Sequence, residues 1–245
     1  MKSTRFDYLV FAGGLLMLWQ LTYYAVGAEI VSSPFATIRR ALELVLTNAF
    51  WVHAEATMSA FGAASLISIA GGIAIGVWLG LRRFAGDVAS PILGSLYSIP
   101  KITLYPLILL AFGLGISAKI AFGVIHGIFP VAIFTMNAVR NVAPVYHRTA
   151  HIMRLSSVTT AMTIMAPAAL PEILAGIRIG IALTLLGTLI GELFASTSGI
   201  GFALVRAMGI HAVTDILALT LLIFIFAALL NASLHFIERW VRHGG

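Results

Sequence analysis

The chain has 245 residues, of which 60% are hydrophobic and 10% are charged, and its mean hydropathy is +1.02. This composition lies outside the range of soluble globular domains and inside that of membrane proteins. The formal net charge is +6 at pH 7, but the basic residues stand in short clusters at the ends of apolar runs, as topology signals do, so we expect no nucleic-acid partner. The absence of cysteine excludes disulfides, thiolate metal ligands and cysteine nucleophiles.

The first apolar run covers residues 8–26 and follows two basic residues, Lys2 and Arg5. A cleavable signal peptide has an apolar core of about 7–15 residues, and this run is longer. It also carries a tryptophan and two tyrosines near its end, and such aromatic residues anchor a helix at the membrane interface. We therefore expect a retained span.

Residues 31–55 are mixed in character and contain Ser33 and Pro34, a capping residue followed by a proline suited to the first helical turn. This pattern predicts an amphipathic helix at the outer surface, without chemistry of its own. Residues 60–81 carry no charge and are followed by two arginines, which predicts a second span and its stop.

Two of the predicted spans, residues 60–81 and 173–191, carry glycine at every fourth position. These glycines are Gly72, Gly76 and Gly80 in the first span and Gly176 and Gly180 in the second. Because glycine lets the backbone of another helix approach closely, we interpret both rows as helix-packing faces.

Residues 88–114 are apolar but contain three prolines, with Lys101 between the last two. Proline frees backbone carbonyls that protein or a wet cavity must satisfy, and charges inside a membrane are costly. Lys101, His126 and Glu192 are therefore candidates for a transport pathway. Each has a structural interpretation as well. Lys101 can satisfy the freed carbonyls, and His126 can be a hydrogen-bonded core residue. Glu192 can pair with Arg206 at the outer interface.

Two further apolar runs, residues 120–139 and 216–237, complete six predicted spans, which leaves both termini on one side. Nine basic residues lie on that side: Lys2, Arg5, Arg82, Arg83, Arg140, Arg148, Arg154, Arg239 and Arg242. Four lie on the other side: Arg39, Arg40, Lys119 and Arg206. The excess of positive charge predicts that both termini are cytoplasmic.

A polar island of residues 140–170 separates the fourth and fifth predicted spans and contains basic residues but hardly any apolar run. Pro144 marks a helix start, and Ser156 and Ser157 can cap a second short helix after a turn. The unit is closed by two prolines, Pro167 and Pro171. We predict a helix, a turn and a second helix outside the bilayer, on the cytoplasmic side.

Four segments carry a resemblance to a known family. They are SIPKITLYPLILLAFGLGISAKI (98–120), HGIFPVAIFTMNAVRNVAPVY (126–146), APAALPEILAGIRIGIA (166–182) and GELFASTSGIGFAL (191–204). These segments closely resemble the membrane subunits of binding-protein-dependent ABC importers, in the branch that serves sulfonates, taurine, nitrate, bicarbonate and related nutrients. The resemblance covers nearly the whole chain and is most specific between residues 98 and 204.

In that family the cytoplasmic loop docks into the ATPase subunit through a pattern that begins Glu-Ala-Ala, with glycine six residues after the glutamate. Registered on Pro167, the acidic position is Thr149 and the glycine position is Leu155, so only Ala150 is retained. Leucine lacks the backbone freedom of glycine, and we expect the turn to fall at Ser156 instead. The resemblance implies these coupling residues: Tyr146, His147, Arg148, Thr149, Ala150, His151, Arg154, Leu155, Ser156 and Ser157.

The resemblance implies an all-α, type I importer permease fold in which residues 1–245 form one transmembrane domain in the bacterial inner membrane. It implies a second copy of the chain as a homodimer partner, two ABC ATPase subunits that bind ATP and magnesium, and an extracytoplasmic substrate-binding protein. No cofactor or metal is expected on this chain. The implied function is the import of a small, anionic organic solute.

Two other functions are weighed from the residues. An ATP-independent secondary carrier or channel would use the same spans, although no internal repeat supports an inverted-repeat carrier. An intramembrane hydrolase would need a serine in a glycine elbow facing His235, whereas the dense serine cluster at residues 196–198 lies outside the predicted spans. The chain has no phosphate-binding loop of the Gly-x-x-x-x-Gly-Lys-Ser/Thr type, so we expect ATP hydrolysis on a separate subunit.

Overall fold

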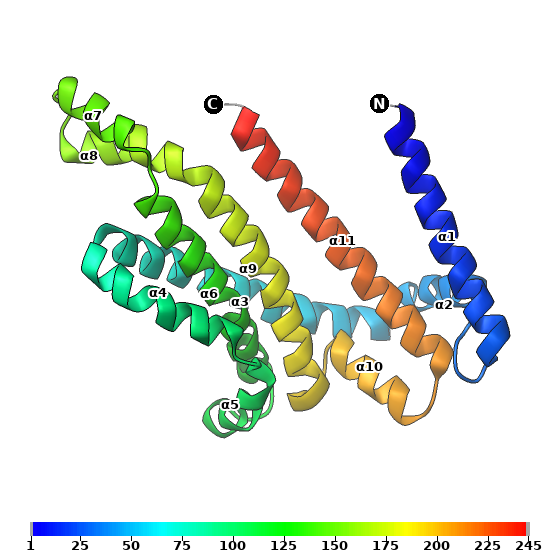
Figure 1. Cartoon of the computed structure of the whole chain (residues 1–245). Coiled ribbons are helices and arrows are strands. Elements are labelled where there is room, and N and C mark those ends of the chain that lie inside the picture. Colours follow the sequence, from blue (N-terminus) through cyan, green and yellow to red (C-terminus); the bar gives the residue numbers. More distant parts are fainter. Residues whose placement is uncertain (1, 244–245) are drawn as a thin grey trace.

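The computed structural model describes residues 2–243, and every element within that range is a helix (Figure 1). In chain order the helices are α1 (Lys2–Val26), α2 (Pro34–Val45), α3 (Asn48–Leu81), α4 (Arg83–Ser98), the 3-10 helix η1 (Lys101–Leu104), α5 (Tyr105–Phe112), α6 (Ile116–Arg140), α7 (Pro144–Ile152), α8 (Ser157–Thr160), the π-helix η2 (Ala161–Met165), α9 (Ala166–Ala195), α10 (Ile200–Gly209) and α11 (Val213–His243). The predicted all-α class is confirmed.

The core is a layer of three long helices in which α6 packs against α3 on one side and α9 on the other. The predicted glycine rows form both contacts. A Cβ atom placed on Gly76 of α3 would lie 2.5 Å from the Cβ of Thr135, and one placed on Gly72 would lie 2.6 Å from the Cβ of Val131. Gly176 and Gly180 bring α9 equally close to α6. The glycines that we interpreted as packing positions therefore lie where these helices approach most closely.

Four described helices are long and apolar enough to cross a membrane, namely α3, α6, the continuous run of η2 and α9, and α11. The bent pair of α4 with η1 and α5 would make a fifth, as a broken span or a re-entrant loop. The apolar part of α1 covers only Val10–Val26, which is shorter than the roughly 20 residues that span a bilayer. The structure therefore supports four or five spans, and the sixth, over residues 8–26, stays a prediction.

The predicted third span, residues 88–114, bends by 86° near its middle. The break falls before Pro100, where α4 has ended at Ser98 and the backbone of Ile99 is extended. Pro91, by contrast, is accommodated inside α4 without ending it. The turn between α5 and α6 uses Gly113 and Gly115, whose φ angles of 69° and 129° favour glycine.

The mixed segment predicted as one amphipathic helix is two elements. Ser33 caps α2 by accepting the N–H of Ala36 at 3.2 Å, with Pro34 in the first turn. Thr47 then caps α3 by accepting the N–H of Phe50, so residues 48–55 belong to the start of a long span and not to a surface helix. Arg40 of α2 is tied to Asp215 of α11, and this hydrogen bond raises the pKa of the arginine.

The segment after the polar island also differs from the prediction. Pro167 and Pro171 do not close the loop, because both lie inside one helix that runs from α8 through η2 to the end of α9. The π-helix stands directly before Pro167, and there Ala166 donates to the carbonyl of Ala161, five residues back. A proline removes one backbone donor, and a local π turn is one way for a membrane helix to rearrange the freed groups.

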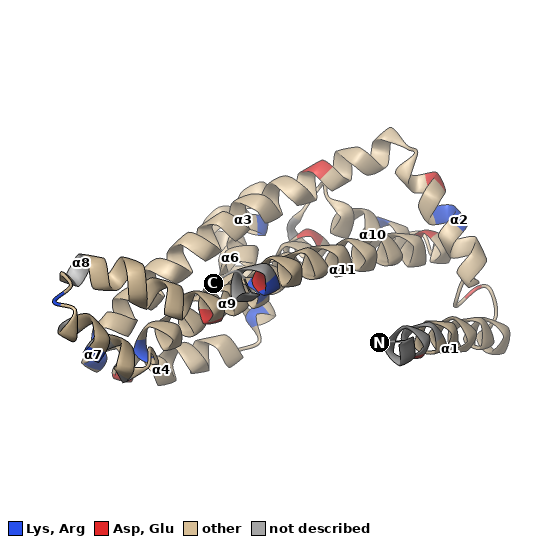
Figure 2. Cartoon of the chain, turned by 90° about the horizontal axis from the view of Figure 1, so that it is seen from above, with Lys and Arg blue, Asp and Glu red and all other residues tan. Residues whose placement is uncertain are grey.

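The two ends of the molecule differ in content. Helices α7 and α8 project from one end, toward which the start of α1 and the end of α11 also lie, while α10 and α2 lie at the other end (Figure 1). The long helices are uncharged over most of their length, and charged residues gather near helix ends (Figure 2). This arrangement suits a bundle that crosses a membrane between two polar surfaces.

Candidate functional site

The loop between α6 and α9 is a helix, a tight turn and a second helix. Helix α7 ends in a Schellman motif, because the N–H of Leu155 bonds the carbonyl of Ala150 at 3.1 Å and Arg154 has a φ of 51°. The left-handed residue is therefore Arg154, and the expected turn at Ser156 is wrong. Ser156 has the other predicted role, since its hydroxyl accepts the N–H of Thr159 at 3.2 Å and caps α8.

The surface of this loop is basic and apolar together. Arg148 and Arg154 are exposed, and they stand among exposed side chains of Ile152, Met153 and Met162. Ala150 is buried at 4% exposure. A projecting element with this mixture resembles the anchors and rim of a protein interface more than a solvated loop.

Three other predicted coupling residues divide into exposed and half-buried ones. Tyr146 is 42% exposed, whereas Leu155 is half-buried in the turn. Thr149, at the acidic position of the family pattern, is exposed and turns its hydroxyl back to the carbonyl of Val145 at 3.0 Å. The side chains of His147, His151 and Ser157 lie outside the described residues.

Lys101 is the first residue of η1, directly after the break that follows α4, and is 9% exposed. Its ammonium group donates to the carbonyl of Tyr97 at 2.7 Å and lies 5.8 Å from the ring centre of Phe129. The carbonyl of Tyr97 would meet the N–H of residue 101 if α4 continued, so the side chain of Lys101 replaces a bond that the break removes.

His126 is 8% exposed in the middle of α6. Its Nδ1 lies 2.7 Å from the carbonyl of Phe122, one turn earlier, and its ring stacks on that of Phe122. These contacts match the structural interpretation of a hydrogen-bonded core histidine.

Glu192 does not pair with Arg206. It is 1% exposed and lies 3.4 Å from the ammonium of Lys119, which is 2% exposed at the start of α6. The hydroxyl of Thr57 on α3 donates to the same carboxylate at 2.9 Å. One buried ion pair therefore joins α3, α6 and α9 at the end of the bundle opposite α7.

The loop after α9 folds over this ion pair. Lys119 donates to the carbonyl of Ser198 at 2.6 Å, and the N–H of Gly201 donates to Glu192 at 2.9 Å. The N–H of Ile200 donates to the hydroxyl of Thr57 at 2.8 Å. A Cβ on Gly199, whose φ is 113°, would collide with the carboxylate. The loop and the first turn of α10 are thus fixed by the buried charges.

Sequence reasoning placed Lys119 in an outer loop and passed over Thr57. A signal for Lys119 was present, because it stands seven residues before His126 and so shares a helix face with it. No comparable signal marks Thr57, which lies 135 residues from Glu192 in the sequence.

The fold and the loop define a multi-pass membrane subunit with close-packed, glycine-lined helices. Its projecting loop of two short helices, α7 and α8 with the turn between them (residues 144–160), is called the elbow below. Residues 72–244 match the family described as binding-protein-dependent transport system inner membrane component, and the chain belongs to this family.

The relatives are transport permeases of similar length. The taurine transport system permease protein TauC of Escherichia coli (strain K12) is 29% identical over 93% of this chain and 86% of its own. The bicarbonate transport system permease protein CmpB of Synechococcus elongatus is also 29% identical, over the same shares. The solved MetNI methionine ABC transporter in an inward-facing conformation matches with a TM-score of 0.65 at 18% identity, covering 82% of this chain and 98% of that one, which shows the shared fold.

Proposed function

We propose that this chain is the membrane subunit of an ATP-driven importer that moves a small organic anion into the cytoplasm. Family membership supports the importer, and the relatives that transport taurine, sulfonates, bicarbonate and nitrate support the class of solute. The observation that carries the mechanism is the exposed basic elbow of α7 and α8 at one end of an otherwise apolar bundle.

In this proposal the elbow is the docking site of an ABC ATPase subunit, which binds ATP and magnesium. Two copies of the chain form a homodimer in the bacterial inner membrane, with both termini in the cytoplasm. Two ATPase subunits bind the homodimer on its cytoplasmic side. A substrate-binding protein delivers the solute at the opposite face. Arg148, Arg154 and the apolar residues between them make the contact, since charged and apolar groups together give an interface both orientation and buried area.

Coupling is mechanical. Helix α8 continues through η2 into α9 without a loop, so displacement of the elbow moves α9. Helix α9 packs on α6, and α6 packs on α3, at glycines where the backbones approach closely. ATP-driven closure of the ATPase dimer therefore moves three spans as a unit about their tied outer ends, which is the two-state element that such coupling requires. We propose that Lys101, in the break of the neighbouring bent pair, lines the pathway that this movement opens.

The test is charge reversal in the elbow. In the complete complex with its ATPase and binding protein, Arg148→Glu and Arg154→Glu should each lower solute uptake by about tenfold or more while ATP hydrolysis continues, because a contact worth roughly 1.4 kcal/mol or more is lost. Uptake and ATP hydrolysis are measured in the same proteoliposomes.

Arg39→Glu is the matched control, because Arg39 is an exposed arginine on α2 at the other end of the molecule. It should leave the ratio of uptake to hydrolysis unchanged. If both elbow variants transport with wild-type coupling, the elbow is not the docking site.

A further inference from the structure

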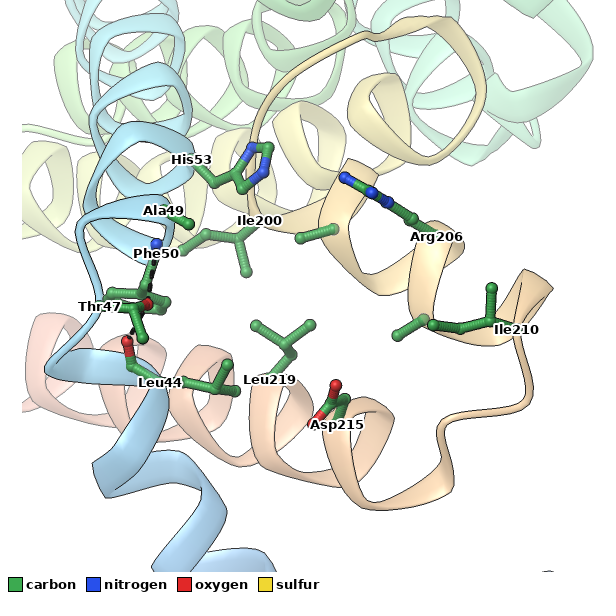
Figure 3. Close-up of a pocket in the computed structure, with 12 residues that line it drawn as sticks. Leu44, Thr47, Ala49, Phe50, His53, Ile200, Arg206, Ile210, Asp215 and Leu219 are labelled. Carbon is green, nitrogen blue, oxygen red and sulfur yellow. Dashed lines mark hydrogen bonds between the residues drawn. The ribbon is translucent and has the colours of Figure 1, made fainter.

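A cavity of about 270 Å³ opens between the α2–α3 junction, α10 and α11 (Figure 3). Helix α10 lies at the end of the bundle opposite α7 and α8 (Figure 1). Most of its wall is apolar, with Phe50 from α3, Ile200 from α10 and Leu219 from α11. Two nitrogen-bearing side chains, His53 and Arg206, enter it from opposing helices and lie on the same side of the cavity in Figure 3.

The charge of Arg206 is not neutralised by the protein. Among the described residues that line the cavity the one carboxylate is Asp215, and Asp215 is held by both Nε and Nη2 of Arg40, at 2.5 and 3.3 Å. Arg206 is exposed and has no ion pair within the described part of the chain. The cavity therefore keeps one uncompensated positive charge.

His53 adds a donor at a fixed position. The N–H of Gly199 donates to its Nδ1 at 3.1 Å, so in the neutral imidazole the proton is on Nε2, which is left to donate. Gly199 is itself held by the buried pair of Lys119 and Glu192, through the loop that folds over that pair. The donors of the cavity are thus positioned before any ligand arrives, which lowers the cost of binding.

We propose that this cavity is a binding site for a small organic anion, whose charged group lies on Arg206 and His53 and whose apolar body contacts Phe50, Ile200 and Leu219. Pockets that bind drug-sized ligands have volumes of about 300–1,000 Å³. This cavity is smaller, and it therefore suits a smaller solute. The assignment of a solute rests on the proposed function, in which such an anion arrives at this face. An anionic lipid offers the same chemistry, and the experiment separates the two sources.

The chain has no cysteine, so a single introduced thiol reports on the cavity alone. Ala203 lines the cavity on α10, three residues before Arg206 and on the same helix face. In Ala203→Cys we compare the labelling rates of 2-sulfonatoethyl and 2-trimethylammonioethyl methanethiosulfonate. Leu114→Cys is the reference, because Leu114 is 75% exposed in the turn after α5, away from the cavity.

Relative to the reference, the anionic reagent should be favoured about tenfold at position 203. Adding Arg206→Gln should remove the preference, Arg206→Lys should retain most of it, and propane-1-sulfonate at millimolar concentration should slow the labelling. Ala49→Cys, on the opposite wall, gives a second reporter if Ala203→Cys does not fold.

Two results overturn the proposal. One is equal labelling at position 203 and at the reference. The other concerns the lipid, and for it the protein is labelled in nanodiscs of phosphatidylcholine or phosphatidylglycerol. If labelling slows in phosphatidylglycerol but not when propane-1-sulfonate is added, the occupant is a lipid. Labelling needs neither ATP nor a binding protein. A complex that is fully coupled but shows no preference therefore removes this site and leaves the proposed function standing.

Discussion

Lys119 and Glu192 carry opposite charges with almost no exposure to solvent. Removing two such groups from water is costly, and their attraction offsets that cost only when the remaining donors and acceptors are satisfied. Here Thr57, Ser198 and Gly201 satisfy them, at 2.6–2.9 Å. The pair therefore specifies the position of a loop, more than it adds net stability.

Lys119→Met should destabilise the protein by about 3–5 kcal/mol, because it leaves the carboxylate of Glu192 buried without a counter-charge. The measurement is thermal unfolding of the purified protein in detergent. The double variant Lys119→Met with Glu192→Gln should recover part of the loss, since it removes the unpaired charge. A single variant as stable as the wild type would show that the pair does not hold this end together.

Glu192 and Lys101 show the limit of prediction at this scale. The cost of a charge within an apolar run made both residues recognisable from the sequence. For Lys101 the sequence also indicated the kind of partner, a backbone carbonyl freed by the break. The partner of Glu192 was not recognisable, because it depends on how three helices pack side by side. The sequence neighbour Arg206 was the plausible partner, yet the register of α6 against α9 brings Lys119 instead.

At the scale of elements, glycine periodicity predicted a packing face on each of α3 and α9, since spacing on one helix face depends only on local geometry. The sequence did not indicate that both faces would lie against α6. Helix ends were less predictable. Pro171 was expected to close the loop before the fifth span, but a membrane helix tolerates proline where neighbours satisfy the freed carbonyls. The start of α3 was also missed, because its first two turns mix polar and aromatic residues and so do not read as part of an apolar run.

Helix α3 carries one crowded glycine, Gly76, and one open glycine, Gly62, and the pair tests the close packing. Gly76→Ala places a methyl group against Thr135 and the carbonyl of Ala132, and overpacking of this kind should cost about 1–3 kcal/mol. Gly62→Ala lies on the same helix with no atom within 4 Å of the new methyl group, and it should be neutral or stabilising by about 0.5–1 kcal/mol. The measurement is the melting temperature of each variant. Equal melting temperatures would contradict close packing through Gly76.

At the scale of the whole molecule, the two ends present different surfaces. Buried charges tie α3, α6 and α9 together near α10, whereas the other end of α9 runs out into an elbow whose basic and apolar side chains are exposed. An elbow that projects from a close-packed bundle can pass the movement of a bound partner to α9.

The chain without its partners should therefore not transport. Reconstituted alone, it should carry solute across liposomes at the background rate, because no ligand-free step moves the elbow. Addition of the ATPase subunit, the binding protein and ATP should raise uptake by about tenfold or more, and a complex whose ATPase cannot hydrolyse ATP should return to background. If the chain alone equilibrates the solute across the membrane, it works as a carrier or channel, and the elbow is then not a coupling element.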